Sequence, residues 1–156
     1  MLIIDNISDT CLNKTAFEKL VRKYIRSCNN VHIIFDKKMK DYGSYVYDLG
    51  KHTINISSVV HKHPNGSRSG KLLQKKIQTM EMISTFLHEF KHMQQRKRLR
   101  NKFFLDGYCK SAFIKTDDYY MAHFSKRETD ARVYEEKNIL MAANFYFSLI
   151  EKKCKI

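Results

Sequence analysis

The pattern of apolar and polar positions predicts a long helix in the middle of the chain. From Gly70 onward, apolar side chains recur every three or four residues, which places them on one face of an α-helix. The main stripe and the residues that widen it are Leu73, Ile77, Met80, Ser84 and Leu87, with Leu72, Met82, Ile83 and Phe86. We therefore expect a buried helix that continues directly through residues 88–92.

Three short runs before this helix have the pattern of β-strands. Residues 31–35 are rich in β-branched side chains, residues 42–47 alternate around a glycine, and residues 52–57 place Ile54 and Ile56 on one face. The polar and glycine-containing segment between the second and third runs is typical of a turn. We expect a small, mostly antiparallel sheet whose second and third strands form a hairpin.

Helical patterns also lie toward both ends of the chain. Thr15 and Glu18 have the spacing of a capping box and precede apolar residues at helical intervals, so we expect the chain to open with a helix. A long final helix is expected from Ser125, as N-cap with Glu128 three residues later, through the apolar run 139–150. The elements together predict an α+β fold.

The composition agrees with one domain over residues 1–156. The chain is 43% hydrophobic, contains a single proline and has no internal repeat, which is enough to build one core. The strongest break is the segment 61–70, where His61 and His63 are interpreted as solvated side chains rather than as metal ligands.

Nothing in the chain indicates export or a membrane anchor. Residues 1–4 lack the basic and apolar regions of a signal peptide, and no stretch is long and apolar enough to span a bilayer. We expect a cytoplasmic protein, or one packaged in a viral particle. The cysteines have no metal-binding spacing and are expected to be reduced thiols; they are Cys11, Cys28, Cys109 and Cys154.

The strongest chemical signal is the motif His-Glu-x-x-His at residues 88–92. On a helix, His88 and His92 lie one above the other and can bind the same cation. Glu89 lies about 100° around the helix, where its carboxylate can reach a water on the metal and accept its proton. The alternative is an amphipathic helix whose two histidines only line a core.

A catalytic zinc normally has three protein ligands and a water, so a third ligand is needed. Acidic residues after the motif are few: Asp106, Asp117, Asp118, Glu128, Asp130, Glu135, Glu136 and Glu151. Among them, Glu128 has two competing interpretations, as a zinc ligand or as the capping partner of Ser125. From the residues alone, both stay open.

The motif at 88–92 followed by Glu-x-Asp-Ala at 128–131 resembles the gluzincin pattern of the zincin metalloproteases. Small single-domain members, such as the ImmA/IrrE type and short zincin-like proteins of phages, have the same order of parts, and the resemblance covers about residues 31–146. It implies one Zn²⁺ per chain. The residues it implies are His88, His92 and Glu128 as ligands, Glu89 as general base and Asp130 as a carboxylate that orients a ligand.

The resemblance also implies how a substrate binds. In zincins an extended peptide pairs with an edge of the small sheet, and residues 57–60 or the strand before them are our candidates for that edge. The donor to the negative oxygen of the reaction could be Tyr119, Tyr120 or His123, which lie just before the expected third-ligand helix, although each could equally pack in the core.

The chain departs from related patterns in two places. The third histidine of metzincins is missing, because positions 95 and 98 are Gln and Arg, and this excludes that class. Lys91 and the polar, mostly basic run 94–98 stand where the gluzincin helix usually has small or aliphatic residues. The second departure concerns the substrate more than the metal.

The chain is strongly basic. Lys and Arg number 29 against 16 acids, giving a net charge of +13, and residues 49–80 and 91–102 contain no acid. We expect a positive potential at the entrance to the cleft, to which the patch of Lys91, Arg96, Lys97, Arg98, Arg100 and Lys102 contributes. Three interpretations are open: a nucleic acid partner, an acidic protein partner, or a general solubility surface.

The function predicted from these observations is a zinc metallopeptidase that acts on a protein or peptide. The alternative is a zincin-fold protein without useful proteolysis, serving as a basic nucleic-acid-associated or particle-bound component. Glu89 favours the enzyme, because a purely structural zinc site needs no general base.

Overall fold

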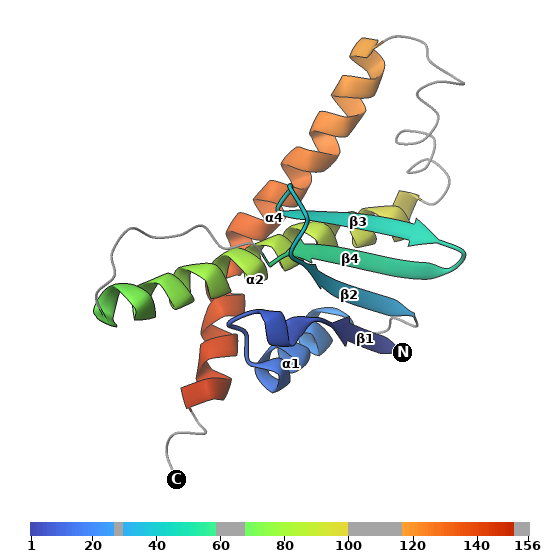
Figure 1. Ribbon diagram of the computed structural model, residues 1–156. Helices are drawn as coiled ribbons and strands as arrows, with labels where there is room; N and C mark the ends of the chain where they lie inside the picture. The colour runs from blue at the N-terminus through green and yellow to red at the C-terminus, as the bar shows by residue number, and fades with distance from the viewer. Residues whose placement is uncertain (27–29, 59–67, 100–116, 152–156) are drawn as a thin grey trace.

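The computed structural model describes residues 1–26, 30–58, 68–99 and 117–151. The predicted α+β class is confirmed: a sheet carries helices on one face, and a long C-terminal helix packs across the central one (Figure 1). The elements in chain order are β1 (Leu2–Asp5), the 3-10 helix η1 (Ile7–Asp9), α1 (Lys14–Tyr24), β2 (Val31–Asp36), β3 (Gly43–Asp48), β4 (Lys51–Ser57), α2 (Arg68–Leu99) and α4 (Asp117–Glu151).

The sheet is mixed and mostly parallel, so the predicted antiparallel character is wrong. Its strand order is β1-β2-β4-β3; β2 is parallel to both β1 and β4, and only β3 pairs antiparallel, with β4. The chain opens with β1 rather than with a helix. This strand is short, and only Leu2 and Ile4 are partly buried, so its pattern is too brief to be recognised.

The predicted hairpin between the second and third runs is confirmed. β3 and β4 pair antiparallel, and the turn between them places Leu49 at φ 44° and Gly50 at φ 82°. Two successive positive φ values match the twist of the flanking strands. The hairpin also corrects the expected edge: β4 pairs on both sides, and the edge strands of the sheet are β1 and β3. Residues 59 and 60 lie outside the described part of the chain.

The core lies between the sheet and the helices. The inward side chains of β2 and β4 are buried, and Phe17 of α1 contacts both Phe35 of β2 and Phe86 of α2 edge to face, at 5.5 and 5.8 Å between ring centroids. These aromatic pairs join α1, α2 and the sheet. The inward strand residues are Val31, Ile33, Phe35, Ile54 and Ile56.

Helix α1 begins one residue before the predicted capping box. Asn13 is the N-cap, and its side chain accepts a hydrogen bond from the Ala16 N–H at 3.0 Å. Glu18, the expected partner of Thr15, instead forms an ion pair with Arg22 at 2.8 Å. The capping box is therefore wrong.

Helix α2 buries part of the predicted apolar face. Met82, Ile83, Phe86 and Leu87 are buried in the core, whereas Ile77 is 37% exposed. The helix lies between the sheet and α4, so its core face is the one that meets both. The other described residues of the predicted stripe, Ile77, Met80 and Ser84, line a cleft.

Helix α4 begins at Asp117, well before the predicted start at Ser125. Glu128 therefore lies inside the helix and cannot be the capping partner, which leaves its carboxylate available to other groups. The apolar run of α4 is only partly in the core, since Leu140 and Met141 are 67% and 53% exposed. In the described part of the chain, no helix combines the length and the hydropathy needed to cross a membrane.

Candidate metal centre

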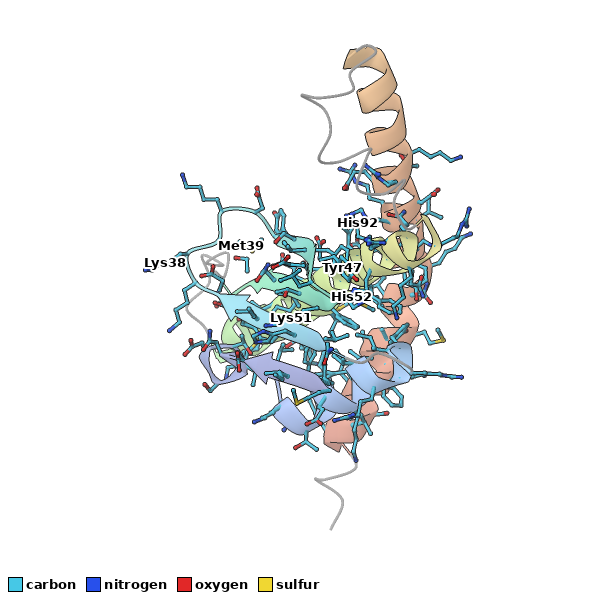
Figure 2. All side chains as sticks on the ribbon, turned by 90° about the vertical axis from the view of Figure 1, so that its right-hand side faces the viewer. Lys38, Met39, Tyr47, Lys51, His52 and His92 are labelled. Atoms are coloured by element: carbon cyan, nitrogen blue, oxygen red, sulfur yellow. The ribbon has the colours of Figure 1, made fainter. Side chains whose placement is uncertain are left out.

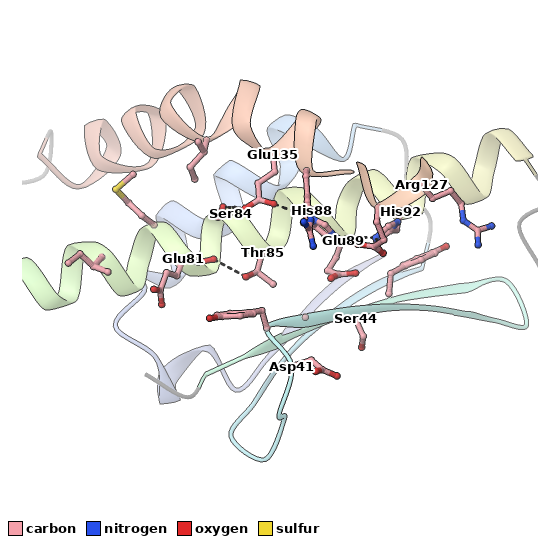
Figure 3. Close-up of a pocket in the computed structure, with 18 residues that line it drawn as sticks. Asp41, Ser44, Glu81, Ser84, Thr85, His88, Glu89, His92, Arg127 and Glu135 are labelled. Carbon is pink, nitrogen blue, oxygen red and sulfur yellow. Dashed lines mark hydrogen bonds and ion pairs between the residues drawn. The ribbon is translucent and has the colours of Figure 1, made fainter. Parts of the chain in front are cut away.

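Two crossing helices bring together three side chains that could hold a metal ion (Figure 3). His88 and His92 lie one turn apart on α2, and Glu128 reaches them from α4. The two Nε2 atoms are 3.2 Å apart, and the Glu128 carboxylate oxygens lie 3.1 Å from the His88 Nε2 and 3.1 Å from the His92 Nε2. Helical spacing accounts for the histidine pair, and the packing of α4 on α2 supplies the carboxylate.

These separations fit a zinc ion. Zinc binds histidine nitrogen and carboxylate oxygen at about 2.0–2.2 Å in tetrahedral sites, so neighbouring ligand atoms are roughly 3.3 Å apart. The two imidazole nitrogens have nearly that spacing, and each of them lies about as far from one of the two Glu128 oxygens. Burial lowers the pKa of the His92 imidazole, which favours the neutral form that binds metals.

The outward ring nitrogens of both histidines are held by hydrogen-bonding partners. The Nδ1 atom of His92 lies 2.9 Å from the Gln95 side-chain oxygen, and the Gln95 amide donates to the Arg127 carbonyl at 3.0 Å. The Nδ1 atom of His88 lies 3.1 Å from a Glu135 oxygen. With a proton on each Nδ1, the lone pair of each Nε2 faces the shared site.

The carboxylate that contacts His88 is not the one predicted. Asp130 is exposed and does not line the cleft, whereas Glu135 contacts His88 and also accepts a hydrogen bond from the Ser84 hydroxyl (Figure 3). Glu135 follows Glu128 by seven residues, which is two turns on the same helix face. That spacing was a usable signal for Glu135 in the sequence.

We predict that Glu135→Gln lowers the zinc affinity of the chain about 10- to 100-fold, because the carboxylate fixes the ring and the tautomer of His88. Competition with a chromophoric chelator measures this. Glu136→Gln is the matched control, since Glu136 is exposed on the same helix and its replacement removes the same charge. Equal affinities in the two variants would contradict the role of Glu135.

Glu89 lies under the sheet, beside the donor group. Its side chain is 6% exposed and points toward β3 (Figure 3). Burial raises the pKa of Glu89 to about 8, and the carboxylates of Glu128 and Glu135 add to the effect. The carboxyl group is thus poised to carry a proton near neutral pH.

Gly43 at the start of β3 leaves room for Glu89. A Cβ atom at position 43 would lie 2.5 Å from the Thr85 methyl carbon and 2.9 Å from the Glu89 Oε1. Both distances are below van der Waals contact, so a larger residue would displace one of the two side chains. The absence of a side chain at Gly43 is a feature of the site that the sequence did not reveal.

We predict that Gly43→Ala destabilises the protein by about 1–3 kcal/mol and lowers any activity that depends on Glu89, because the new methyl group overlaps Thr85 and Glu89. Urea unfolding measures the stability. Combining it with Thr85→Ser, which removes the nearest methyl group, should restore part of the loss. A double variant no more stable than Gly43→Ala would argue against this contact.

The donor group lies in a cleft of about 1130 Å³ between α2, α4 and the start of β3. Its lining includes more acids than bases, with Arg127 and Arg132 as the basic residues. The acids are Asp41, Glu81, Glu89, Glu128 and Glu135. The described lining is therefore more acidic than basic, while several basic residues expected at the entrance, such as Lys62, Arg100 and Lys102, lie outside the described residues.

The four described residues of the predicted basic patch are not among the residues that line the cleft. Lys91 and Arg96 are placed over aromatic rings, at 5.2 Å from the Tyr134 centroid and 4.3 Å from the Tyr47 centroid. Lys97 and Arg98 are exposed near the end of α2. Arg100 and Lys102 lie outside the described residues, and so do the side chains of Tyr119, Tyr120 and His123.

An aromatic and histidine cluster on the hairpin borders the cleft. Tyr45, which lines the cleft, has its hydroxyl 2.8 Å from the Nδ1 of His52, and the Tyr47 ring lies 4.9 Å from the His52 ring (Figure 2). Burial lowers the pKa of His52, and Lys97 and Arg96 lower it further. Tyr45 is thus a cleft residue that the sequence did not single out.

Comparison with known proteins assigns no family to the chain. No family model matches it, and no curated protein or solved structure matches it. The candidate metal site is therefore supported by the geometry of its residues and not by similarity to a known protein.

Proposed function

We propose that the protein is a zinc-dependent metallopeptidase. The proposal depends chiefly on one observation, that one donor atom from each of His88, His92 and Glu128 lies within 4.8 Å of the other two inside a large cleft. These residues would hold the metal, leaving one coordination position for water. Glu89 lines the same cleft, as a general base must.

Zinc bound here would supply a Lewis acid that lowers the pKa of water toward ~7 and polarises the peptide carbonyl. Proton transfer and the orientation of the ligands depend on the protein's own residues. The Glu89 carboxylate accepts the proton of the attacking water and passes it to the nitrogen of the leaving amine. Glu135 and Gln95 hold the two imidazoles so that both Nε2 atoms face the reacting centre.

A peptide is the substrate that the surroundings of the site favour. β3 is an edge strand, and its first residues Gly43, Ser44 and Tyr45 line the cleft. An extended peptide added to this edge would hydrogen-bond to the strand and pass the donor group. In this proposal the substrate pairs with β3, rather than with residues 57–60 or β4 as predicted from the sequence.

Metal analysis and a cleavage assay together test the proposal. Protein purified without chelator or immobilised nickel should contain about one zinc per chain, and the zinc-loaded chain should cut an unfolded protein substrate. Chelation should stop the cleavage, and added zinc should restore it. A chain that binds zinc but cuts nothing would support the alternative, a binding or structural protein associated with nucleic acid or a particle.

A further inference from the structure

One half of the cleft is not used by the proposed chemistry. It is lined by Ile77, Met80 and Glu81 of α2 and by Ile139 of α4. Glu81 precedes His88 by seven residues, so it lies about 10 Å away along the helix axis. An extended peptide covers that distance in roughly three residues. This half of the cleft is therefore placed to receive a substrate side chain.

The chemistry of this half combines an apolar wall with an available carboxylate. Ile77 is 37% exposed, although it is apolar. Glu81 is half-buried, and within the described residues its carboxylate has no hydrogen bond or ion pair. Its backbone carbonyl accepts a hydrogen bond from the Thr85 hydroxyl at 2.9 Å. A carboxylate beside aliphatic side chains suits a long cationic side chain, whose stem is apolar and whose end is charged.

The rest of the cleft adds to the negative potential. Besides Glu89, four acids line it against two arginines, in a chain whose net charge is +13. Glu89 in the same cleft is 6% exposed and has no hydrogen bond with the described residues. Carboxylates at this density repel phosphates, which argues against nucleic acid in this cleft.

We propose that the cleft takes a basic peptide segment and that Glu81 binds a lysine or arginine side chain about three residues from the bond that is cut. The stem of that side chain packs along Ile77 and Met80, and its cationic end forms a charge-assisted hydrogen bond with the Glu81 carboxylate. This inference depends on the proposed peptidase function, since it assigns the substrate class of the same site.

The test measures peptide binding rather than cleavage. The full-length Glu89→Gln chain, with and without added zinc, is titrated with fluorescent peptides of neutral host sequence that carry one lysine, one norleucine or one glutamate. Norleucine has the stem of lysine without its charge. The lysine peptide should bind about tenfold more tightly than the norleucine peptide, and the glutamate peptide most weakly.

Two variants locate the effect. Adding Glu81→Gln should remove the preference for lysine over norleucine, and Glu81→Lys should favour the glutamate peptide instead. Glu136→Gln is the matched control, because it removes the same charge from an exposed position of α4 that does not line the cleft. The control should keep the tenfold preference.

Equal binding of the lysine and norleucine peptides, a comparison that needs no substitution at Glu81, would overturn the inference. An equal loss of preference with Glu136→Gln and Glu81→Gln would overturn it too. Cleavage by the wild-type chain separates this outcome from failure of the proposed function. Cutting without a basic preference refutes only the inference. A binding preference without cutting refutes the peptidase, and with it the position of the basic side chain relative to a cut bond, but keeps Glu81 as the binding site for that side chain.

Discussion

Replacing Glu89 by glutamine should lower kcat/KM for peptide hydrolysis about 10³-fold and leave about one zinc per chain. The carboxylate lies beside the donor group, but the candidate metal ligands are other residues, so the substitution should remove a proton acceptor without removing a ligand. Hydrolysis of a fluorogenic peptide by the zinc-loaded variant measures the first effect, and metal analysis measures the second. Unchanged activity would exclude Glu89 as the general base.

The stability of the same variant shows whether a loss of activity comes from misfolding. In the metal-free protein the pKa of Glu89 is raised from 4.5 to about 8, mainly by burial. A raised pKa means that the neutral form stabilises the fold fully below pH 4.5, and that this contribution is lost as the pH rises through 8. Glutamine is neutral at every pH, so the metal-free variant should be more stable than the wild type at alkaline pH.

The expected gain is as much as roughly 4 kcal/mol at pH 8.5, from about 1.4 kcal/mol per pKa unit. Urea unfolding of both metal-free chains at pH 5 and pH 8.5 measures it, and the difference should grow with pH. A variant that is more stable and less active cannot owe its inactivity to unfolding. If Glu89→Gln were less stable than the wild type at both pH values, ionisation of a buried Glu89 would not be what destabilises the wild type at alkaline pH.

The sequence predicted the parts of the site that depend on one helix. His88 and His92 are fixed by the spacing of α2, and the acids after them were few enough to bring Glu128 into consideration. Its competing interpretation as a capping partner failed only because α4 begins earlier than the pattern indicated. Helix starts are weakly specified when no cap residue is clear.

The parts that depend on packing could not be predicted from the sequence. Gly43 matters because β3 passes directly over Glu89, and that register comes from pairing with β4. The sheet type was missed for a related reason: β1 has only four residues, and parallel pairing joins segments far apart in the chain.

The charge of the cleft is another long-range property. Many of the basic residues are concentrated in two acid-free segments, 49–80 and 91–102. The acids of the cleft, in contrast, come from separate parts of the chain: the loop before β3, α2 and α4. Asp41, Glu81 and Glu89 have no other acid within four residues. Runs of charge in the sequence therefore indicate a basic surface, but they do not indicate that acids gather in the cleft.

Replacing Glu128, the candidate third ligand, should have a large effect on zinc affinity. Glu128→Ala should lower zinc affinity by more than about 100-fold, because it removes the charged donor that joins α4 to the histidines of α2. Chelator competition measures the affinity. Glu136→Ala, on the exposed side of α4, is the matched control and should bind zinc like the wild type.

Zinc should also stabilise the contact between the two helices, since a ligand that binds only the folded state raises its stability by mass action. At free zinc about 100 times the dissociation constant, the wild type should gain about 2.7 kcal/mol in unfolding free energy, and Glu128→Ala should gain almost nothing at the same concentration. Thermal unfolding with and without zinc measures both. Because His88 and His92 would remain one turn apart in the variant, wild-type zinc binding by Glu128→Ala would mean that the metal takes its third donor from elsewhere.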